Sequence, residues 1–355
     1  VAEIAAPISF SKGQVAMARM TLKFYAQLAR DFAFEEQRKG YFGSVIVRKE
    51  PVGVVAAIVP FNGPLFAAML KLGPALASGS TVVLKVPMET PLFSYVLAEC
   101  IVAAGFPAGV INILPADREA SEYLVDHADV SMVSITGSVV AGRSVAKACG
   151  SQIKRSALEL GGKSAAIVCE DADPAQIVPA LANASVINSG QACAAQTRLL
   201  IPQSRYEEYI AALATAYQSM NMGDPADPVT ELGPMIHERH FQRVKAYIQT
   251  GLDEGARLVT GGQTPAELEP GYFIQPTLLA DVSNDMRVAR EEIFGPVVCA
   301  IPYDDIDDAI RIANDSDMGL SGSVWTSDVE AGLAIGRRID AGNFSINGFL
   351  MGVAA

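Results

Sequence analysis

Residues 53–65 read GVVAAIVPFNGPL. The run Val54 to Val59 is uncharged and rich in valine, which is typical of a strand buried on both faces. Two prolines and a glycine follow within residues 60–64, and they would end any single helix. The uncharged stretch Pro51 to Leu70 is therefore predicted to form a strand, a loop and a helix rather than a membrane span.

The same alternation continues outward from this stretch. Further strands are predicted at Thr81 to Val86, Val110 to Leu114 and Val130 to Ile135. Helices are predicted at Leu65 to Ala77, Pro91 to Ala104, Arg118 to His127 and Val139 to Cys149. Strands that alternate with helices in this way predict a doubly wound, Rossmann-like α/β domain.

A second α/β segment begins near Leu158. Its predicted strands are Ala165 to Val168, Arg198 to Ile201 and two more near Val297 and Val324. Its predicted helices are Pro174 to Asn188, Ser204 to Met220 and His237 to Glu254. Because 355 residues exceed what one hydrophobic core usually supports, we predict an α/β fold of two doubly wound domains, residues 1–158 and 159–355. A β-rich run within Tyr41 to Lys49 predicts a small arm at about residues 34–51.

The composition excludes several classes of function. The chain has 39 acidic and 27 basic residues and a net charge of -12, which would repel a nucleic-acid backbone. Its five cysteines are scattered and form no framework of close pairs, which favours a reducing, cytoplasmic compartment. We predict neither a nucleic-acid nor a membrane partner.

Three residues are candidates for chemistry. Cys193 ends the small-residue run NSGQAC, where a thiol could be a nucleophile or a buried structural cysteine. Glu159 precedes two glycines, and desolvation there would raise its pKa toward that of a general base; a salt bridge with Lys163 is the alternative. Asn62 lies in the loop after the first strand, where its amide could donate to an oxyanion or merely serve in a turn.

Other motifs are weaker. The backbone of Thr136, Gly137 and Ser138 could face a pyrophosphate, or Ser138 could simply cap a helix. The run GKS at residues 162–164 does not complete a P-loop, because position 157 is alanine and a strand-like run follows. His237 and His240 are interpreted as part of a solvated helical face rather than a metal pair, and the acids of residues 304–308 as the start of a helix. No metal site is predicted.

Taken together, these segments resemble the aldehyde dehydrogenase superfamily over nearly the whole chain. The resemblance lies in residues 60–64, 71–76 (KLGPAL), Lys85, 136–138 with Gly142, 158–164 (LELGGKS), 190–193 and 291–297 (EEIFGPV). It implies that Cys193 attacks the aldehyde, with Asn62 and the Cys193 amide holding the oxyanion. Hydride would pass to a nicotinamide, and Glu159 would then activate water to release the acid. Lys71 belongs to the same implied catalytic set.

The resemblance also implies cofactor contacts. They are Val59, Pro60, Phe61, Lys85, Glu89, Thr136, Gly137, Ser138, Leu160, Gly161, Glu292 and Phe294. Many NAD-preferring members carry glutamate three residues after the cofactor lysine, whereas Met88 stands here and the acid, Glu89, is displaced by one. The cofactor is therefore NAD or NADP, and Glu89 favours NAD.

Two further expectations follow from the resemblance. Gly63 replaces the bulky aromatic residue of many members, which predicts a wider tunnel and turnover of branched or aromatic aldehydes. The family's N-terminal segment and C-terminal tail are expected to be missing from this chain, and the full-length protein is expected to be a homodimer or homotetramer. A relative that passes the acyl group to coenzyme A and a catalytically silent member are the alternatives; Glu159 argues against the first, and Asn62, Glu159 and Cys193 together argue against the second.

Overall fold

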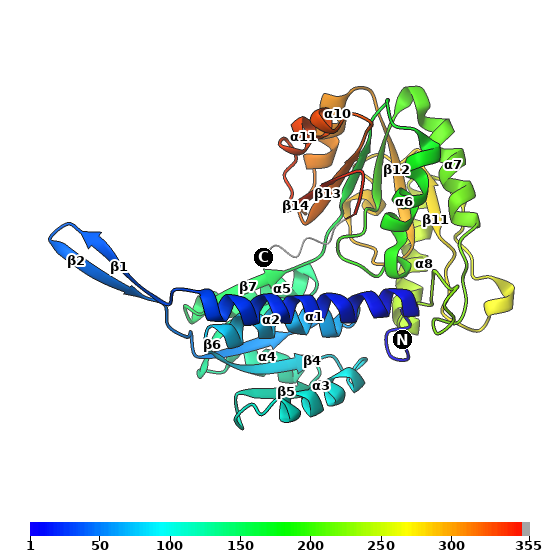
Figure 1. Cartoon of the computed structure of the whole chain (residues 1–355). Helices are drawn as coiled ribbons and strands as arrows, with labels where there is room; N and C mark the ends of the chain where they lie inside the picture. The colour runs from blue at the N-terminus through cyan, green and yellow to red at the C-terminus, as the bar shows by residue number, and fades with distance from the viewer. Residues whose placement is uncertain (350–355) are drawn as a thin grey trace. The chain divides into compact units, whose positions relative to one another are not determined.

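A computed structural model describes residues 1–349 of the chain (Figure 1). The chain divides into two compact units. One contains Ser11–Leu160, and the other contains Val1–Phe10 together with residues 161–349. Each unit is built on a largely parallel sheet with helices, so the predicted α/β class is confirmed.

The unit Ser11–Leu160 contains a parallel sheet in the order β5-β4-β3-β6-β7. Its strands are β3 Val54–Ile58, β4 Thr81–Val86, β5 Ile111–Pro115, β6 Val130–Thr136 and β7 Arg155–Glu159. Its helices are α2 Pro64–Ala77, α3 Leu92–Ala103, α4 Arg118–Asp126 and α5 Val139–Ser151, together with α1 Ile8–Asp31 from Ser11 onward. The strands and helices predicted between residues 54 and 151 are confirmed to within two residues at each end, whereas β7 was not predicted.

Both faces of this sheet are covered by helices. Val55 and Ala57 of β3 belong to one apolar cluster with Leu72 of α2. Ile58 belongs to the opposite cluster with Val145 of α5. Because successive side chains of a strand point to opposite faces, this burial on both sides explains why β3 reads as an uninterrupted apolar run.

An exposed hairpin precedes the sheet (Figure 1). β1 Glu35–Gly40 pairs antiparallel with β2 Gly43–Arg48, within the predicted arm. The sequence predicted only the second strand, since β1 reads EEQRKG and carries no apolar pattern. Tyr41 and Phe42 at the turn are 95% and 97% exposed.

The other unit contains a sheet in the order β10-β11-β12-β9-β8-β13-β14, parallel except for β10. Its strands are β8 Ala165–Val168, β9 Arg198–Pro202, β10 Arg257–Thr260, β11 Thr277–Ala280, β12 Val297–Tyr303, β13 Ser321–Trp325 and β14 Asn343–Ile346. Its helices are α6 Pro174–Val186, α7 Tyr206–Gln218, α8 Glu238–Asp253, α9 Arg287–Arg290, α10 Ile306–Asn314 and α11 Val329–Gly336. Two apolar clusters again cover its two faces.

Two interpretations of weak motifs are confirmed. Strand β8 follows Lys163 and Ser164, so the GKS run does not open a helix as a P-loop must. Asp305 caps α10 by accepting from the Asp308 amide, so these acids do lie at the start of a helix. Within residues 1–349, no helix combines the length and the apolar content that a membrane crossing requires.

Candidate active site

The carboxyl edge of the first sheet gathers the predicted residues of its unit. From β3 the chain moves outward in one direction to β4 and β5, and β6 and β7 then lie on the other side of β3. The reversal places a topological switch point between β3 and β6, where open α/β sheets bind ligands. Residues 59–62 leave β3 at this edge, and Gly137 and Ser138 leave β6 beside them.

Ser138 caps α5. Its Oγ accepts a hydrogen bond from the Ala141 amide at 3.2 Å, so the cap considered as an alternative is present. A side chain at Gly142 would overlap the side chain of Leu160, so glycine allows the first turns of α5 to approach the end of β7. The Gly137 amide donates to the Glu159 carbonyl at 3.0 Å, which joins the β6 loop to the same strand end.

A pocket of about 740 Å³ opens beside this cap. Lys85, Glu89 and Ser138, three of the predicted cofactor residues, line it. Its charged lining residues are the cations Lys85 and Arg118 and the acids Glu89, Asp117, Glu122 and Asp126. Burial lowers the pKa of Lys85, while Glu89 and Asp117 oppose this shift. The Arg118 Nε donates to Glu122 at 2.7 Å, so its charge is already paired.

Lys71 and Glu159 form an electrostatic pair within this unit. Lys71 is buried in α2, and burial lowers the pKa of its ammonium to about 8 although Glu159 raises it. Desolvation raises the pKa of Glu159, and Lys71 opposes that rise. The predicted direction of the Glu159 shift is confirmed, but Glu159 lies on the exposed edge strand β7 rather than at a fully buried strand end.

The Asn62 loop is held by a residue that the sequence analysis did not single out. Gln14, buried in α1, donates from Nε2 to the Asn62 carbonyl at 3.1 Å. A Cβ at Gly63 would meet the Gln14 side chain at 3.4 Å. Gln14 therefore occupies part of the space beside Gly63 that an aromatic residue would need.

Two residues before Cys193 adopt the left-handed backbone conformation, and they set the shape of the loop. Helix α6 ends at Val186, two residues before the predicted end, because Asn188 and Ser189 adopt φ of 53° and 56°. The Ser189 Oγ donates to the Gly233 carbonyl at 2.8 Å, and the Gln191 Oε1 accepts from the Ile236 amide at 3.0 Å. These bonds stabilise a conformation that non-glycine residues rarely adopt. Cys193 is partly exposed after this turn, whereas Cys149 and Cys299 are buried.

Gly161 and Gly162 lie between the main chain of Cys193 and the side chain of Glu292. A side chain at Gly161 would overlap the Glu292 carboxylate, and one at Gly162 would meet the Cys193 carbonyl at 2.5 Å. The Gly162 amide donates to the Glu292 Oε1 at 3.2 Å. Burial raises the pKa of Glu292, and this amide and Lys163 oppose the rise. The fold thus assembles Cys193, Gly161 and Glu292 around close backbone contacts.

Phe294 follows in the same segment and is held by His240. The Phe294 backbone has φ of 66°, and its carbonyl accepts from the His240 Nε2 at 2.7 Å. The expectation of a solvated helical face is therefore wrong for His240, because the imidazole turns inward against Phe294. His237 instead caps α8 by accepting from the His240 amide at 3.0 Å.

A family model described as aldehyde dehydrogenase family matches residues 1–355. The chain belongs to the aldehyde dehydrogenase family. It is 47% identical over 330 residues to the geranial dehydrogenase of Castellaniella defragrans, covering 93% of this chain and 69% of that relative. It is 42% identical over 302 residues to the phenylacetaldehyde dehydrogenase of Pseudomonas fluorescens, covering 84% of this chain and 60% of that relative.

Solved structures of the family have the same fold. An aldehyde dehydrogenase of Mycobacterium tuberculosis complexed with NAD+ matches with a TM-score of 0.96 and 45% identity, covering 98% of this chain and 72% of that one. A variant of aldehyde dehydrogenase C from Pseudomonas syringae, complexed with NAD+ and octanal, matches with a TM-score of 0.95 and 39% identity, covering 99% and 72%. Family and relatives support an oxidoreductase that oxidises an aldehyde with a nicotinamide dinucleotide.

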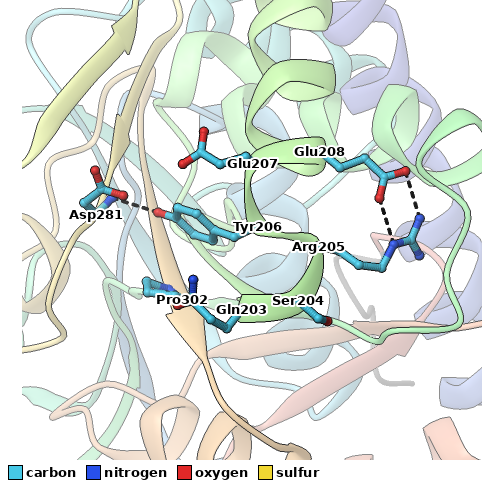
Figure 2. Close-up of a pocket in the computed structure, with 8 residues that line it drawn as sticks. All are labelled: Gln203, Ser204, Arg205, Tyr206, Glu207, Glu208, Asp281 and Pro302. Carbon is cyan, nitrogen blue, oxygen red and sulfur yellow. Dashed lines mark hydrogen bonds and ion pairs between the residues drawn. The ribbon is translucent and has the colours of Figure 1, made fainter.

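A second pocket of this family member lies away from the predicted residues. Its volume is about 330 Å³, and residues 203–208 at the start of α7 line it together with Asp281 and Pro302 (Figure 2). The Tyr206 hydroxyl accepts from the Asp281 amide at 2.7 Å and donates to the Ala300 carbonyl at 3.0 Å. Arg205 pairs with Glu208 on the other side. The Tyr206 hydroxyl thus connects α7 to the residue after β11 and to the middle of β12, so the pocket has a structural explanation.

Proposed function

We propose that this chain oxidises an aldehyde to a carboxylic acid through a thioester on Cys193. One observation carries the proposal: Gly161 and Gly162 lie directly between the Cys193 main chain and the Glu292 carboxylate. The backbone of Cys193 and the residue that the family resemblance assigns to the nicotinamide ribose therefore contact two adjacent glycines. Residues 1–158 would bind the cofactor, and residues 159–355 would carry the nucleophile.

The Cys193 sulfur forms a C–S bond to the aldehyde carbon, and the carbonyl electrons move onto oxygen. The Asn62 amide and the Cys193 backbone N–H donate to that oxyanion, which is a large source of rate in acyl transfer. The bound nicotinamide ring supplies the hydride acceptor. Loss of hydride leaves a thioester, whose carbon is then attacked by water as the C–S bond breaks.

Glu159 acts as the general base for that water. A general base works best when its pKa lies near the working pH, and burial moves Glu159 in this direction. Lys71 limits the shift, so that the carboxylate stays ionised often enough to accept a proton. Lys71 thus lowers the pKa of Glu159 in this mechanism.

The dinucleotide is NAD in this proposal. The resemblance implies further contacts from Val59, Pro60, Phe61, Thr136, Gly137, Leu160 and Phe294. The pocket beside Ser138 is large enough for an adenosine moiety, and four acids against two cations line it. An added 2'-phosphate would meet net negative charge there, and Arg118 is already paired with Glu122. Glu89 would accept hydrogen bonds from the ribose hydroxyls, the role that the resemblance gives to a glutamate at the position where this chain has Met88.

The substrates are branched or aromatic aldehydes. Gly63 has no side chain to narrow the space next to Asn62, although Gln14 fills part of that space. Two relatives are named for geranial and phenylacetaldehyde, a branched and an aromatic aldehyde. If only two-carbon and three-carbon aldehydes turned over appreciably, this part of the proposal would fail.

The active assembly is a homodimer or homotetramer. The β1–β2 hairpin exposes Tyr41, Phe42 and Ile46 together with its open strand edges. Such edges are usually covered by another strand, here one from a second copy.

The test is a dinucleotide-reduction assay that crosses NAD and NADP with small, branched and aromatic aldehydes. Cys193→Ser should abolish the steady-state rate, because a hydroxyl at neutral pH is a far weaker nucleophile. An unchanged rate would refute the thioester. Product analysis with and without coenzyme A distinguishes free acid, as proposed, from an acyl-coenzyme A product.

A further inference from the structure

The main chain around Cys193 forms a tight turn. The Ala195 amide donates to the Ala192 carbonyl at 3.1 Å. Cys193 and Ala194 are therefore the two middle residues of this turn. The Ala192 carbonyl and the Cys193 N–H belong to one peptide group, which is planar. The direction of the Cys193 N–H thus depends on how the turn is held.

A serine of strand β13 holds the other end of the turn. The Ser321 Oγ donates to the Ala194 carbonyl at 3.2 Å and lies 2.8 Å from the Ser164 Oγ. A hydroxyl has a single proton, and that of Ser321 points to the Ala194 carbonyl. Ser164 is therefore the donor to Ser321, and the two hydroxyls form a short chain of hydrogen bonds that ends at the turn.

The turn continues this chain through its own peptide groups. The Ala194 carbonyl that accepts from Ser321 shares a peptide group with the Ala195 N–H. That N–H donates to the Ala192 carbonyl, which shares a peptide group with the Cys193 N–H. Hydrogen bonds in series polarise one another where the local dielectric constant is low. Because the three alanines are buried, the series makes the Cys193 N–H a stronger donor.

The same strand also holds the residue that follows the turn. The Ser323 Oγ donates to the Gln196 Oε1 at 2.7 Å, and the Trp325 Nε1 donates to the Ser323 Oγ at 2.8 Å. All three of these side chains are buried. Ser321, Ser323 and Trp325 alternate along β13, so they share one face of the sheet. Strand β13 therefore supports residues 194–196 at two positions.

Backbone packing brings the start of β13 close to Cys193. A side chain at Gly162 would lie 2.5 Å from the Cys193 carbonyl and 3.2 Å from the Leu320 Cβ. The residue before Ser321 and the main chain of the nucleophile therefore pack on the same glycine. Close packing of this kind leaves the turn little room to shift while the Ser321 bond is in place.

We propose that Ser321 is a positioning residue for the reaction, which orients and polarises the Cys193 N–H toward the oxyanion. The inference rests on the proposed function, in which that N–H holds the oxyanion. Ser164 acts through Ser321, and Ser323 acts through Gln196 on the same segment. None of these hydroxyls has to touch the aldehyde.

The test compares Ser321→Ala, which removes the donor, with Ser321→Thr, which retains a hydroxyl. Single-turnover formation of NADH from NAD and an aldehyde separates the chemical step from product release. Ser321→Ala is expected to lower this rate about tenfold, a part of the roughly 100- to 1,000-fold that loss of a whole oxyanion donor costs. Ser321→Thr should recover most of the rate.

A second measurement reports on the sulfur alone. Iodoacetamide alkylates a thiolate by attack at a methylene group, which creates no oxyanion. Peptide mass analysis follows the alkylation of Cys193 apart from the other cysteines. In Ser321→Ala, the alkylation rate and the dissociation constant of NADH should each change less than about threefold. A general loss of structure would change both.

Ser185→Ala is the matched control, because it removes another buried serine hydroxyl of the same unit. The partners of that hydroxyl are the Ala182 carbonyl and the Tyr217 hydroxyl, in helices α6 and α7. Its rates should stay within about twofold of the unmodified chain. Ser323→Ala is the second variant, should Ser321→Ala fail to fold, and is expected to slow NADH formation about threefold.

The inference is wrong if Ser321→Ala forms NADH as fast as Ser185→Ala does, or if Ser321→Thr loses as much rate as Ser321→Ala. It is also wrong if alkylation slows as much as NADH formation, because the effect would then lie in the sulfur. A different result ends the proposed function itself: no NADH from any aldehyde with the unmodified chain, or an unchanged rate in Cys193→Ser. The two kinds of failure are distinguished because they appear in different variants.

Discussion

Lys71 and Ser134 are joined by a hydrogen bond of 3.1 Å from the lysine Nζ to the serine Oγ. The bond links α2 to β6, the strand that pairs with β7 and so with the segment that ends in Glu159. The lysine is buried, and the pKa of its ammonium falls to about 8. The sequence suggests no such link, since the two residues stand 63 positions apart.

Replacing Lys71 by methionine should move the acid limb of the kcat profile to higher pH. Lys71 lowers the pKa of Glu159, so its removal raises that pKa and leaves fewer carboxylates ionised at a given pH. The pH dependence of kcat measures the effect, and Lys71→Arg, which retains the charge, should move the limb much less. An acid limb in the same place for Lys71→Met would show that Glu159 is not the group that titrates.

Ser134→Ala should destabilise the unit Ser11–Leu160 by about 1–2 kcal/mol, because a buried ammonium loses its acceptor. The pKa of Lys71 should fall below its present value of about 8, since the charged form loses a partner. Urea unfolding measures the first effect. Ser156→Ala, exposed on β7, is the control and should be neutral within about 0.5 kcal/mol.

Gly190→Ala should destabilise the chain by at least about 2 kcal/mol. Gly190 has φ of 72°, and a side chain there would overlap the carbonyl of Gly295. Gly150→Ala is the matched control, because nothing lies within 4 Å of its missing Cβ in helix α5. The control should be neutral or stabilising by about 0.5–1 kcal/mol. Equal unfolding midpoints for the two variants would contradict this description of the Cys193 loop.

Glu89→Lys should shift the cofactor preference toward NADP by at least about tenfold in the ratio of kcat/KM values. The change replaces an acid by a cation in a pocket where acids otherwise outnumber cations. Initial rates with both dinucleotides give the ratio. Met88→Leu, a change without charge at the neighbouring position, should leave the ratio within about twofold. If Met88→Leu shifted the cofactor preference as much as Glu89→Lys does, the effect would come from packing and not from charge.

Gln14→Met should lower kcat about tenfold with little change in the NAD KM, because the Asn62 carbonyl loses the donor that holds its loop. Gln27→Met, exposed on the same helix, controls for the loss of an amide and should have no effect. Should Gln14→Met instead raise only the NAD KM, Gln14 would belong to cofactor binding rather than to the oxyanion loop.

Local pattern predicted most of the first sheet. Valine-rich runs predicted the positions of β3, β4 and β6, because strands that helices cover on both faces are rich in apolar residues. It failed at β1 and β7, which lie in an exposed hairpin and at a sheet edge. Strands in such places need no apolar side chains, so backbone pairing alone defines them.

Some residues of the candidate site were predicted from the sequence and others were not. Cys193, Glu159 and Asn62 stood out by their glycine-rich and proline-rich surroundings, whereas Gln14 and His240 did not. A glutamine and a histidine within amphipathic helices give no local sign of which backbone carbonyl they bind. For His240 the charged neighbours Glu238 and Arg239 favoured solvent, and tertiary packing overrode them.

The sequence by itself determined the order of strands and helices along the chain, the family and the residue types available for chemistry, because buried periodicity and short motifs are local properties. Only the tertiary structure decided which carbonyl each buried donor binds and which groups lie close to Gly161 and Gly162. It also decided that Lys71 and Glu159 shift each other's pKa. Those outcomes depend on contacts between residues tens of positions apart, and their energies come from desolvation and close packing.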